Sequence, residues 1–383
     1  MSTQSAAVAP RRAPAKIDPQ SQGERFFGMY QRWMAGYAEE FRGLTIDAKP
    51  RAELFRLAPT GHSTEAIQKA AQAFLDALTT EERATCCFEM DSKLWRGWSN
   101  IHRNVMRHGI CLADLDDARR SLALDVLRAG MSAQGFQSAR DAMRLNEHLA
   151  ELTGKPDQFG EWFYYLSFFG TPSVGEPWGW QWDGHHCNVN CFVVGDQMTL
   201  TPTLFGAEPV SAASGVYAGT RILAAEEAAG WRLMASLTAE QQSLARLGIE
   251  LPFDGQGSGF QDNVVVPYQG ISYAKLSAAQ QAALVDLVAL FVGRMPMAHA
   301  ALKMAEVRAH LDETWFAWIG LHDETSPFYY RVHSPVVWLE YFNQPFIALP
   351  GKGFSRHHAH GLMRTPNGND YGRAWLAQYR KAG

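Results

Sequence analysis

The first third of the chain carries apolar residues at helical spacing. In TEAIQKAAQAFLDAL they recur every three or four positions, and DDARRSLALDVLRAG repeats the pattern and ends at Gly130, a typical helix stop. MSAQGFQSARDAMRLNEHLAEL continues the pattern, and Gly154-Lys155-Pro156 closes it. Because one face of each such helix is apolar, these segments predict a helical layer over about residues 23–157.

From Trp162 onward the pattern changes to aromatic and β-branched runs. WFYYLSFFG and CNVNCFVVGDQMTLTPTLFG are strand-like, and Gly195-Asp196 within the second run signals a hairpin. Helical segments at about 224–237 and 277–313 interrupt this region, and TWFAWIG, FYYRVHS and PVVWLEYFN return to strands. The predicted fold class is α+β, with the N-terminal helical layer packed on a mostly antiparallel β-sheet that has helical insertions and covers about residues 158–383.

Polar residues occupy one face of the predicted hairpin. Because successive strand side chains point to opposite faces, His186, Asn188 and Asn190 share one side, whereas the side that carries Cys187 is apolar. The return strand alternates in the same way, with a polar side made of Thr199, Thr201 and Thr203. This pattern predicts that the polar side chains line one cavity. The alternative is a solvated sheet face, although the stretch contains few of the Lys and Glu residues that populate such faces.

A second histidine cluster lies in SRHHAHGLMRTPNGNDYG, close to the C-terminus. His358 and His360 are two positions apart, so in an extended strand they share a face and can hold one metal ion together. With His357 and the pair His185-His186, five of the 13 histidines fall in two dense clusters. We therefore predict that the clusters meet at a shared metal site. The alternative is that each histidine is a satisfied structural residue.

The candidate ligands suit a divalent transition metal, with zinc or iron expected. Imidazole-rich sites bind zinc, iron, copper or nickel, and Asp183 or Glu208 would complete either a zinc site or a two-histidine, one-carboxylate iron site. Arg364 follows the second cluster, and a tight turn at Asn367-Gly368 leads to Asp370. Arg364 could anchor an anionic substrate group, or it could form an ion pair with Asp370 that pins the C-terminal turn.

Composition and charge narrow the choice of partners. The chain of 383 residues is 46% hydrophobic, its net charge is -4, and its pI of about 6.4 gives no electrostatic footprint for nucleic acid or an anionic membrane. A small-molecule substrate is the expected partner, and the oligomeric state is left open. Five cysteines without a CxxC pair, no apolar run of membrane-spanning length and no signal peptide predict a reduced, cytoplasmic protein. Residues 1–22 are expected to be a disordered arm and residues 23–383 a single α+β domain.

Several motifs of the β-rich part resemble those of the domain of unknown function 3500 family of bacterial and fungal proteins. The resemblance is carried by WGWQWDGHHCNVN, TPTLFGAEP, FQDNVVVPYQG, FYYRVHSPVVWLEY and HHAHGLMRTPNGNDYG, and it extends from about Arg51 to the C-terminus. It implies that the Gly-His-His and His-x-His elements are the characteristic polar motifs, but it implies no substrate or mechanism. Where members of this family often carry a larger apolar residue after the histidine pair, this chain has Cys187.

These observations favour a metal-dependent enzyme that acts on a small molecule, hydrolytic by preference. His186, His358 and His360 would hold the metal with His185 or Asp183, a bound water would lose its proton to Glu208 or Asp370, and Arg364 would hold the substrate. An oxidative enzyme would use the same ligands with iron. A non-enzymatic binding protein with an aromatic pocket, and a purely structural role, are further alternatives. The proposed substrate pocket comprises Trp180, Trp182, Asn188, Asn190 and Thr201.

Overall fold

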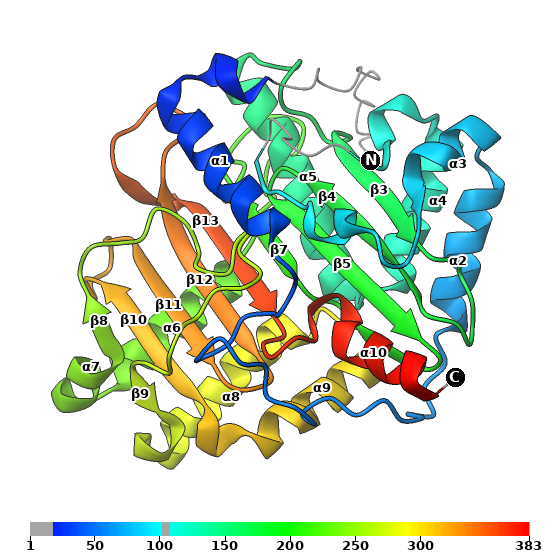
Figure 1. The fold of residues 1–383 in the computed structure, drawn as a ribbon. Helices are drawn as coiled ribbons and strands as arrows, with labels where there is room; N and C mark the ends of the chain where they lie inside the picture. The colour runs from blue at the N-terminus through cyan, green and yellow to red at the C-terminus, as the bar shows by residue number, and fades with distance from the viewer. Residues whose placement is uncertain (1–17, 102–107, 383) are drawn as a thin grey trace, which may run out of the picture.

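One large sheet forms the middle of the molecule (Figure 1). The computed structural model describes residues 18–101 and 108–382. The strands are β1 (Cys87–Phe88), β2 (Ile110–Cys111), β3 (Tyr164–Phe169), β4 (Trp178–Gly184), β5 (Cys187–Val194), β6 (Gln197–Thr199), β7 (Thr203–Ala207), β8 (Arg246–Gly248), β9 (Ile271–Ser272), β10 (Trp315–Gly320), β11 (Phe328–His333), β12 (Trp338–Pro345) and β13 (Phe354–Arg364). They hydrogen-bond in the order β1-β3-β4-β5-β7-β13-β12-β11-β10-β8, with β2, β6 and β9 beside β3, β5 and β10.

The sheet is mostly antiparallel, as the sequence predicts. Within the described residues, β1 pairs with β3 and β8 with β10 in parallel, and the other neighbours are antiparallel. The two end strands of the path, β1 and β8, are only two and three residues long. Short edge strands offer few unpaired backbone groups to another chain.

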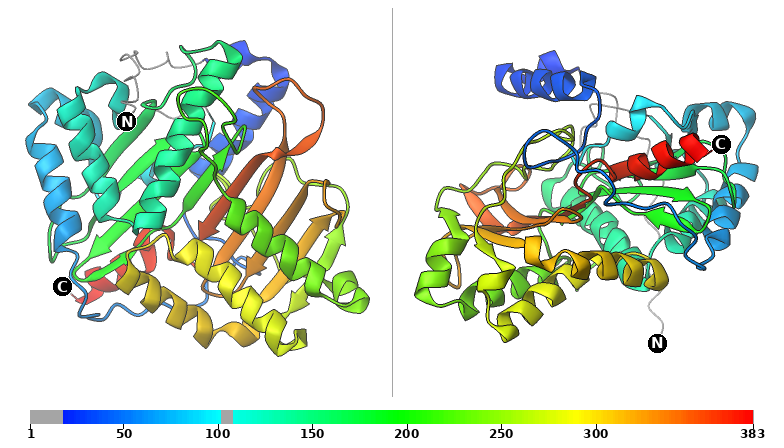
Figure 2. Two further views of the ribbon diagram at one scale, coloured as in Figure 1. Left: turned by 180° about the vertical axis from the view of Figure 1, so that it is seen from behind. Right: turned by 60° about the horizontal axis from the view of Figure 1, so that its bottom comes forward.

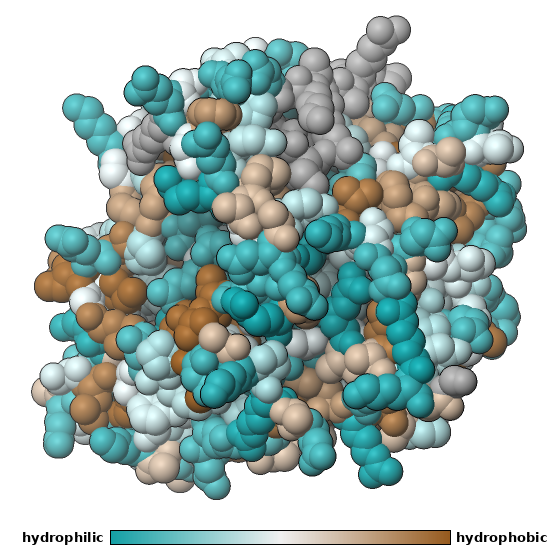
Figure 3. All heavy atoms as spheres, in the orientation of Figure 1, coloured by the Kyte–Doolittle hydropathy of each residue, from teal (hydrophilic) through white to brown (hydrophobic). Residues whose placement is uncertain are grey.

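Apolar residues gather on the surface over α7 and β8 (Figure 3), where Leu244, Leu247 and Ile249 are exposed.

Helices cover much of one face of the sheet and a smaller part of the other (Figure 2). They are α1 (Glu24–Ala38), α2 (Glu65–Asp76), α3 (Thr80–Cys86), α4 (Asp117–Ala129), α5 (Ala133–Thr153), α6 (Ala224–Ser236), α7 (Ala239–Ala245), α8 (Ala278–Val292), α9 (Met297–Ala309) and α10 (Arg373–Ala382). The helices α4, α5, α6, α8 and α9 lie behind the sheet, whereas α1, α10 and long connecting segments lie in front of it. The α+β fold class is therefore confirmed.

The helical segments largely match the sequence pattern. The stretch expected at 277–313 is two helices, α8 and α9, because Pro296 has no backbone N–H to continue a helix and disfavours helical geometry in the residue before it. The first 17 residues of the expected arm lie outside the described residues, and Pro19–Gln22 forms a short 3-10 helix. No helix among residues 18–101 and 108–382 is both long and apolar enough to cross a membrane.

The predicted hairpin at Gly195-Asp196 is present, but its return strand is interrupted. Val194 pairs with Gln197 across the turn, and Gly195 has a φ of 58°. The return segment leaves the ladder at residues 200–202 and resumes as β7, which pairs with the start of β5. The apolar side of β5, including Cys187, faces the helical layer together with Trp180 and Trp182. The polar side is also buried, so it is not a solvated face.

Candidate metal centre

His185 and His186 form the complete connection between β4 and β5. Strand β4 ends at Gly184 and β5 begins at Cys187, so the two histidines are a two-residue turn and His186 does not begin the strand as the alternation pattern supposed. His186 has a φ of 62°. A residue other than glycine in this left-handed region costs about 1–2 kcal/mol, and such strain concentrates at functional sites. The turn therefore holds the His186 ring at the end of the sheet at some cost in stability.

The second cluster lies on an extended strand, as its spacing predicts. Strand β13 includes His357, His358 and His360, of which His357 is exposed and the other two are buried. Residues two apart on a strand point to the same face, so His358 and His360 lie together while His357 points away from them. The odd-numbered neighbour Gly361 faces the helical layer at Leu223 and Phe291. The histidine pair consequently faces the front of the sheet.

Strand β7 brings the two clusters together across 172 residues of sequence. Gly206 of β7 donates its backbone N–H to the carbonyl oxygen of His186 at 2.8 Å and pairs directly with His360 on its other side. A Cβ atom at position 206 would collide with the His360 ring and lie 2.7 Å from the carbonyl oxygen of Ala359. Gly206 therefore leaves the space in which the rings of His186 and His360 approach each other.

The three histidines form a buried group that could hold a metal ion. His186, His358 and His360 are at most 4% exposed, and one ligand nitrogen from each lies within 4.8 Å of the others. The Nε2 atoms of His186 and His358 are 3.2 Å apart. Two nitrogens that bind a tetrahedral zinc ion at about 2.0–2.1 Å are about 3.3 Å apart, so this pair already has the required spacing. His360 needs only a small movement to join it.

Hydrogen bonds orient the rings for this role. Nδ1 of His358 donates to the carbonyl oxygen of Pro345 at 2.8 Å, which leaves a lone pair on its Nε2. Within the described part of the chain, Nδ1 of His360 has no hydrogen-bond partner, and its Nε2 lies 3.4 Å from the side-chain amide nitrogen of Asn100. Burial lowers the pKa of His358 although Glu208 opposes the shift, and burial together with His358 holds the pKa of His360 far below its usual value. Both rings are therefore neutral at physiological pH, the form that binds metals.

Glu208 lies beside the group and is held by backbone donors. One of its oxygens is 3.6 Å from Nδ1 of His358, and its carboxylate accepts hydrogen bonds of 2.9–3.1 Å from the backbone N–H groups of Ile347, Ala348 and Leu349. At 3.6 Å the carboxylate is beyond hydrogen-bond distance, so the Pro345 carbonyl oxygen orients the ring while the charge of Glu208 raises the basicity of His358. This geometry suits Glu208 to supporting His358.

A pocket of about 130 Å³ opens beside the histidines. Met29 and Trp33 of α1 form part of its wall, and Asp254 from the segment between β8 and β9 forms another part. The remaining lining residues are Asn100, Ile101, His185, His186, Glu208, Phe253, Gln344, Ile347, Ala348 and His358. Burial raises the pKa of Asp254 to about 6, although Ser258 and the Gly255 backbone N–H each donate a 2.8 Å hydrogen bond to one of its oxygens. Asp254 is thus a carboxyl group suited to proton transfer near neutral pH.

Two candidate ligands from the first cluster are held away from the group. Asp183 accepts hydrogen bonds from the backbone N–H of Ser99 at 2.9 Å and from Nδ2 of Asn188 at 2.6 Å. The Nδ1 atom of His185 is 2.7 Å from the side-chain oxygen of Asn146, and its ring stacks on that of His186 with centroids 3.8 Å apart. In the structure, the His185 ring therefore packs against the His186 ring. Asp183 accepts hydrogen bonds from Ser99 and Asn188.

Arg364 and Asp370 meet each other as expected, but outside the histidine pocket. The Nε atom of Arg364 donates to Asp370 at 2.8 Å, one terminal nitrogen donates to the carbonyl oxygens of Gly257 and Gln261 at 3.0 Å, and the other pairs with Asp262. Burial alone would lower the pKa of Arg364, but the two carboxylates outweigh it and raise the pKa. Arg364 is fully buried. This is the arrangement expected of an ion pair that pins the C-terminal turn.

The expected pocket residues lie in two other surroundings. Trp180 and Trp182 are fully buried in the core under the helical layer, where Trp182 stacks with Tyr164. Asn188 and Asn190 are buried beneath the 95–100 segment, and Asn190 bonds to Gln181 and the Pro202 carbonyl oxygen.

The cavity expected to join the histidine turn to the threonines of the return strand is not formed. Thr199 and Thr201 line a second pocket. Thr199 pairs with Phe192, which is six residues from His186 and therefore about 20 Å away along the strand. One small cavity cannot span that distance, so the prediction that His186 and the threonines share a cavity was wrong.

Sequence reasoning missed four residues that shape the site. Gly206 stands in the TPTLFGAEP motif, and a glycine inside a strand is a known sign of close approach. Asp254 lies in PFDGQGSG, a glycine-rich stretch that predicts a loop but no function. Asn100 follows a tryptophan-rich stretch that contains no known motif. Trp33 lies on a helix with no other connection to the clusters. Only the glycine carried a signal that could have been used.

Comparison with known proteins identifies the family of this chain. A family model described as "Protein of unknown function (DUF3500)" matches residues 60–373, which is most of the 383-residue chain. The chain therefore belongs to the DUF3500 family. The matched region includes all three histidines and Asp254, whereas α1 lies before it. No curated protein and no solved structure matches the chain.

Proposed function

We propose that this protein is a metal-dependent enzyme that acts on a small molecule, with His186, His358 and His360 as the metal ligands. The observation that carries the proposal is the buried group of three ligand nitrogens, two of whose histidines line the neighbouring pocket. Structural zinc sites are closed by four protein ligands, whereas catalytic sites use three and keep one position for water or substrate. Three histidines beside a pocket match the catalytic type.

Zinc is the metal that the ligand set supports best. The group found among the described residues contains three imidazoles and no carboxylate, whereas the common iron oxygenase site uses two histidines and one carboxylate. The two carboxylates that the sequence suggested as ligands have other partners: Asp183 is bonded to Ser99 and Asn188, and Glu208 to the backbone at 347–349. The oxidative alternative therefore has less support than the hydrolytic one.

The chemistry follows from the residues that surround the three histidines. Zinc bound by three histidines lowers the pKa of a coordinated water to about 7 and supplies a nucleophile for hydrolysis. Asp254 is our candidate for accepting and returning the proton, in place of Glu208 or Asp370, because it lines the same pocket and has a pKa of about 6. Trp33 and Ile347 would contact the apolar part of a small substrate.

A binding protein without catalytic activity is the main alternative. Trp180 and Trp182, which the sequence analysis expected in an aromatic pocket, are packed in the core. Aromatic contact in the pocket comes from Trp33 and Phe253 instead. This alternative needs no metal, so metal content distinguishes it from the proposed enzyme.

Metal analysis of the full chain purified without a histidine tag tests the proposal. We expect about one zinc ion per chain, and loss of that zinc in the His358→Ala and His360→Ala variants because each removes a ligand. His357→Ala is the matched control, since His357 is the exposed neighbour on the same strand and should keep its zinc. Equal metal content in all four proteins, or a wild-type chain that takes up no zinc after loading, would contradict the proposal.

A further inference from the structure

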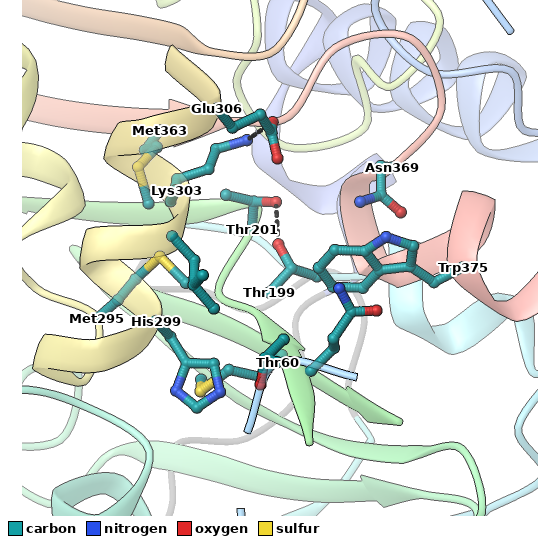
Figure 4. A pocket seen from close by; sticks show the side chains of 13 residues that line it. Thr60, Thr199, Thr201, Met295, His299, Lys303, Glu306, Met363, Asn369 and Trp375 are labelled. Atoms are coloured by element: carbon teal, nitrogen blue, oxygen red, sulfur yellow. Dashed lines mark hydrogen bonds and ion pairs between the residues drawn. The ribbon is translucent and has the colours of Figure 1, made fainter. Parts of the chain in front are cut away.

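A second pocket, which we call the threonine cavity, lies at the other end of β5 from the histidines (Figure 4). Its volume is about 190 Å³, and it shares no lining residue with the histidine pocket. Strands β6 and β13, helices α9 and α10 and the segment around Thr60 form its walls. The lining residues are Thr60, Gln197, Met198, Thr199, Thr201, Met295, His299, Leu302, Lys303, Glu306, Met363, Asn369 and Trp375.

Two buried polar atoms of this cavity have no hydrogen-bond partner among residues 18–101 and 108–382. They are the side-chain oxygen of Asn369 and Nε1 of Trp375, in residues that are 2% and 9% exposed. Figure 4 shows both side chains on the same side of the cavity. A buried polar group that stays unpaired costs about 1–3 kcal/mol. One atom is an acceptor and the other is a donor, so a single bound group with a donor and an acceptor would satisfy both.

The threonines and the charged pair of the cavity already have partners. Thr199 and Thr201 are joined at 3.1 Å, and Thr201 continues to Thr365 at 2.9 Å. Lys303 donates to Glu306 and to the carbonyl oxygen of Val336, both at 2.7 Å. These contacts leave the paired charges of Lys303 and Glu306 balanced.

His299 adds no charge to the threonine cavity. Its Nε2 donates to the carbonyl oxygen of Asp196 at 3.0 Å, and burial lowers its pKa, so the ring is neutral at physiological pH. With Lys303 and Glu306 paired, the cavity carries no net charge and favours an uncharged ligand.

The rest of the wall is apolar and adaptable. Met198, Met295 and Met363 contribute thioethers, Leu302 contributes an isobutyl group, and Trp375 contributes its indole ring. Methionine is flexible and polarizable, which allows it to fit compact ligands of irregular shape. The cavity therefore combines a paired donor and acceptor on one side with an apolar surface on the other.

We propose that the threonine cavity binds a small uncharged amide, such as a lactam or a primary amide. The amide carbonyl accepts a hydrogen bond from Nε1 of Trp375, the amide N–H donates to the side-chain oxygen of Asn369, and the hydrocarbon part packs on the methionines. An amide edge presents its acceptor and donor side by side in one plane, which matches the two unpartnered groups. This proposal does not depend on the metal centre.

Binding of ε-caprolactam to the full chain tests this assignment by NMR of the tryptophan indole N–H groups. The Trp375→Phe variant identifies the resonance of Trp375, because that signal disappears when the indole is replaced. We expect ε-caprolactam to shift this resonance saturably in the wild-type chain. N-methylcaprolactam, which lacks the N–H donor, should bind about tenfold or more weakly because the oxygen of Asn369 stays unpaired.

Two variants separate the cavity from the metal centre. Asn369→Ala should bind the two lactams with nearly equal, weak affinity, whereas His358→Ala should bind ε-caprolactam as the wild type does. The proposal is overturned if ε-caprolactam leaves the Trp375 resonance unmoved, or if both lactams bind equally to the wild type. The first result would mean that the threonine cavity does not take up a lactam, and the second that the oxygen of Asn369 does not recognise an amide N–H.

Discussion

Two buried residues of strand β13, Arg364 at its C-terminal end and His360 four residues earlier, differ in how completely their polar groups are paired. All three side-chain nitrogens of Arg364 donate hydrogen bonds, which go to Asp370, Asp262 and two backbone carbonyl oxygens. His360 is equally buried, yet among the described residues its Nδ1 has no hydrogen-bond partner and its Nε2 has only a 3.4 Å contact with Asn100. Both residues lie on the same side of one strand, so position in the fold does not explain the difference.

The comparison shows how a functional site can be told from a structural network. A buried charge that is fully paired with acceptors in fixed places stabilises one arrangement of the chain and has no capacity left for a ligand. Buried imidazoles that face one another with lone pairs available are costly unless a further group satisfies them. The incomplete hydrogen bonding at His360 therefore marks the candidate site, and the complete bonding at Arg364 marks a support.

The largest effect is expected from breaking the support. Arg364→Leu would leave Asp370 buried without its cation and would leave Asp262 with Arg96 as its remaining arginine partner. Removing one partner of a buried ion pair costs about 3–5 kcal/mol, so the free energy of unfolding should fall by that amount in denaturant titrations. Zinc content per folded chain should stay unchanged. A stable Arg364→Leu variant that had lost its zinc would contradict the roles assigned to Arg364 and His360.

A smaller effect, on both stability and zinc affinity, is expected at Gly206. This residue of β7 lies between His186 and His360 of β13. In Gly206→Ala the new Cβ would press on the His360 ring, so we expect a loss of about 1–3 kcal/mol in stability and a weaker zinc affinity. Gly248→Ala is a matched control, because Gly248 is also in a strand and nothing lies within 4 Å of the added Cβ. Zinc titration and thermal unfolding measure both properties. Unchanged zinc affinity in Gly206→Ala would show that the ring has room to shift.

The smallest effect is a pH dependence from Asp254. Its pKa is about 6 in the folded chain, above the 3.8 of a free carboxyl, so the folded state holds its proton more tightly than the unfolded state. The stability should therefore fall as pH rises from about 4 to about 6, by about 1 kcal/mol after allowance for its partial exposure. Asp254→Asn should be more stable than the wild type at pH 8 and equal to it below pH 4. A difference that persists at low pH would point to another cause.

Sequence alone predicted the helices and strands of this fold better than the tertiary contacts between them. Periodicity located the helices and the strands, including the hairpin at Gly195-Asp196, because both depend on local patterns. The spacing of His358 and His360 predicted their common face for the same reason. The approach of His186 to them depends on β7 lying between β5 and β13, and no local pattern specifies that order.

The residues around the metal group were harder still to predict. Asp254 reaches the pocket from a loop, and Trp33 from a helix near the N-terminus. Their positions depend on tertiary packing rather than on the spacing of residues in the chain. Asp183, which stands next to the histidine turn in sequence, is instead used to hold the backbone of Ser99. Nearness in sequence was therefore a poor guide to which carboxylate faces the pocket.

The turn between β4 and β5 consists of His185 and His186 alone, and this short length limits the insertions and deletions that the sequence can tolerate there. Inserting or deleting one residue there would shift His186 relative to Gly206 and turn the following strand so that its polar and apolar faces exchange. The connection from β7 to α6 spans residues 208–223 and runs mostly outside the sheet, so it can absorb changes in length. Insertions among relatives that keep the metal group should accumulate in connections of that kind and never within the histidine turn.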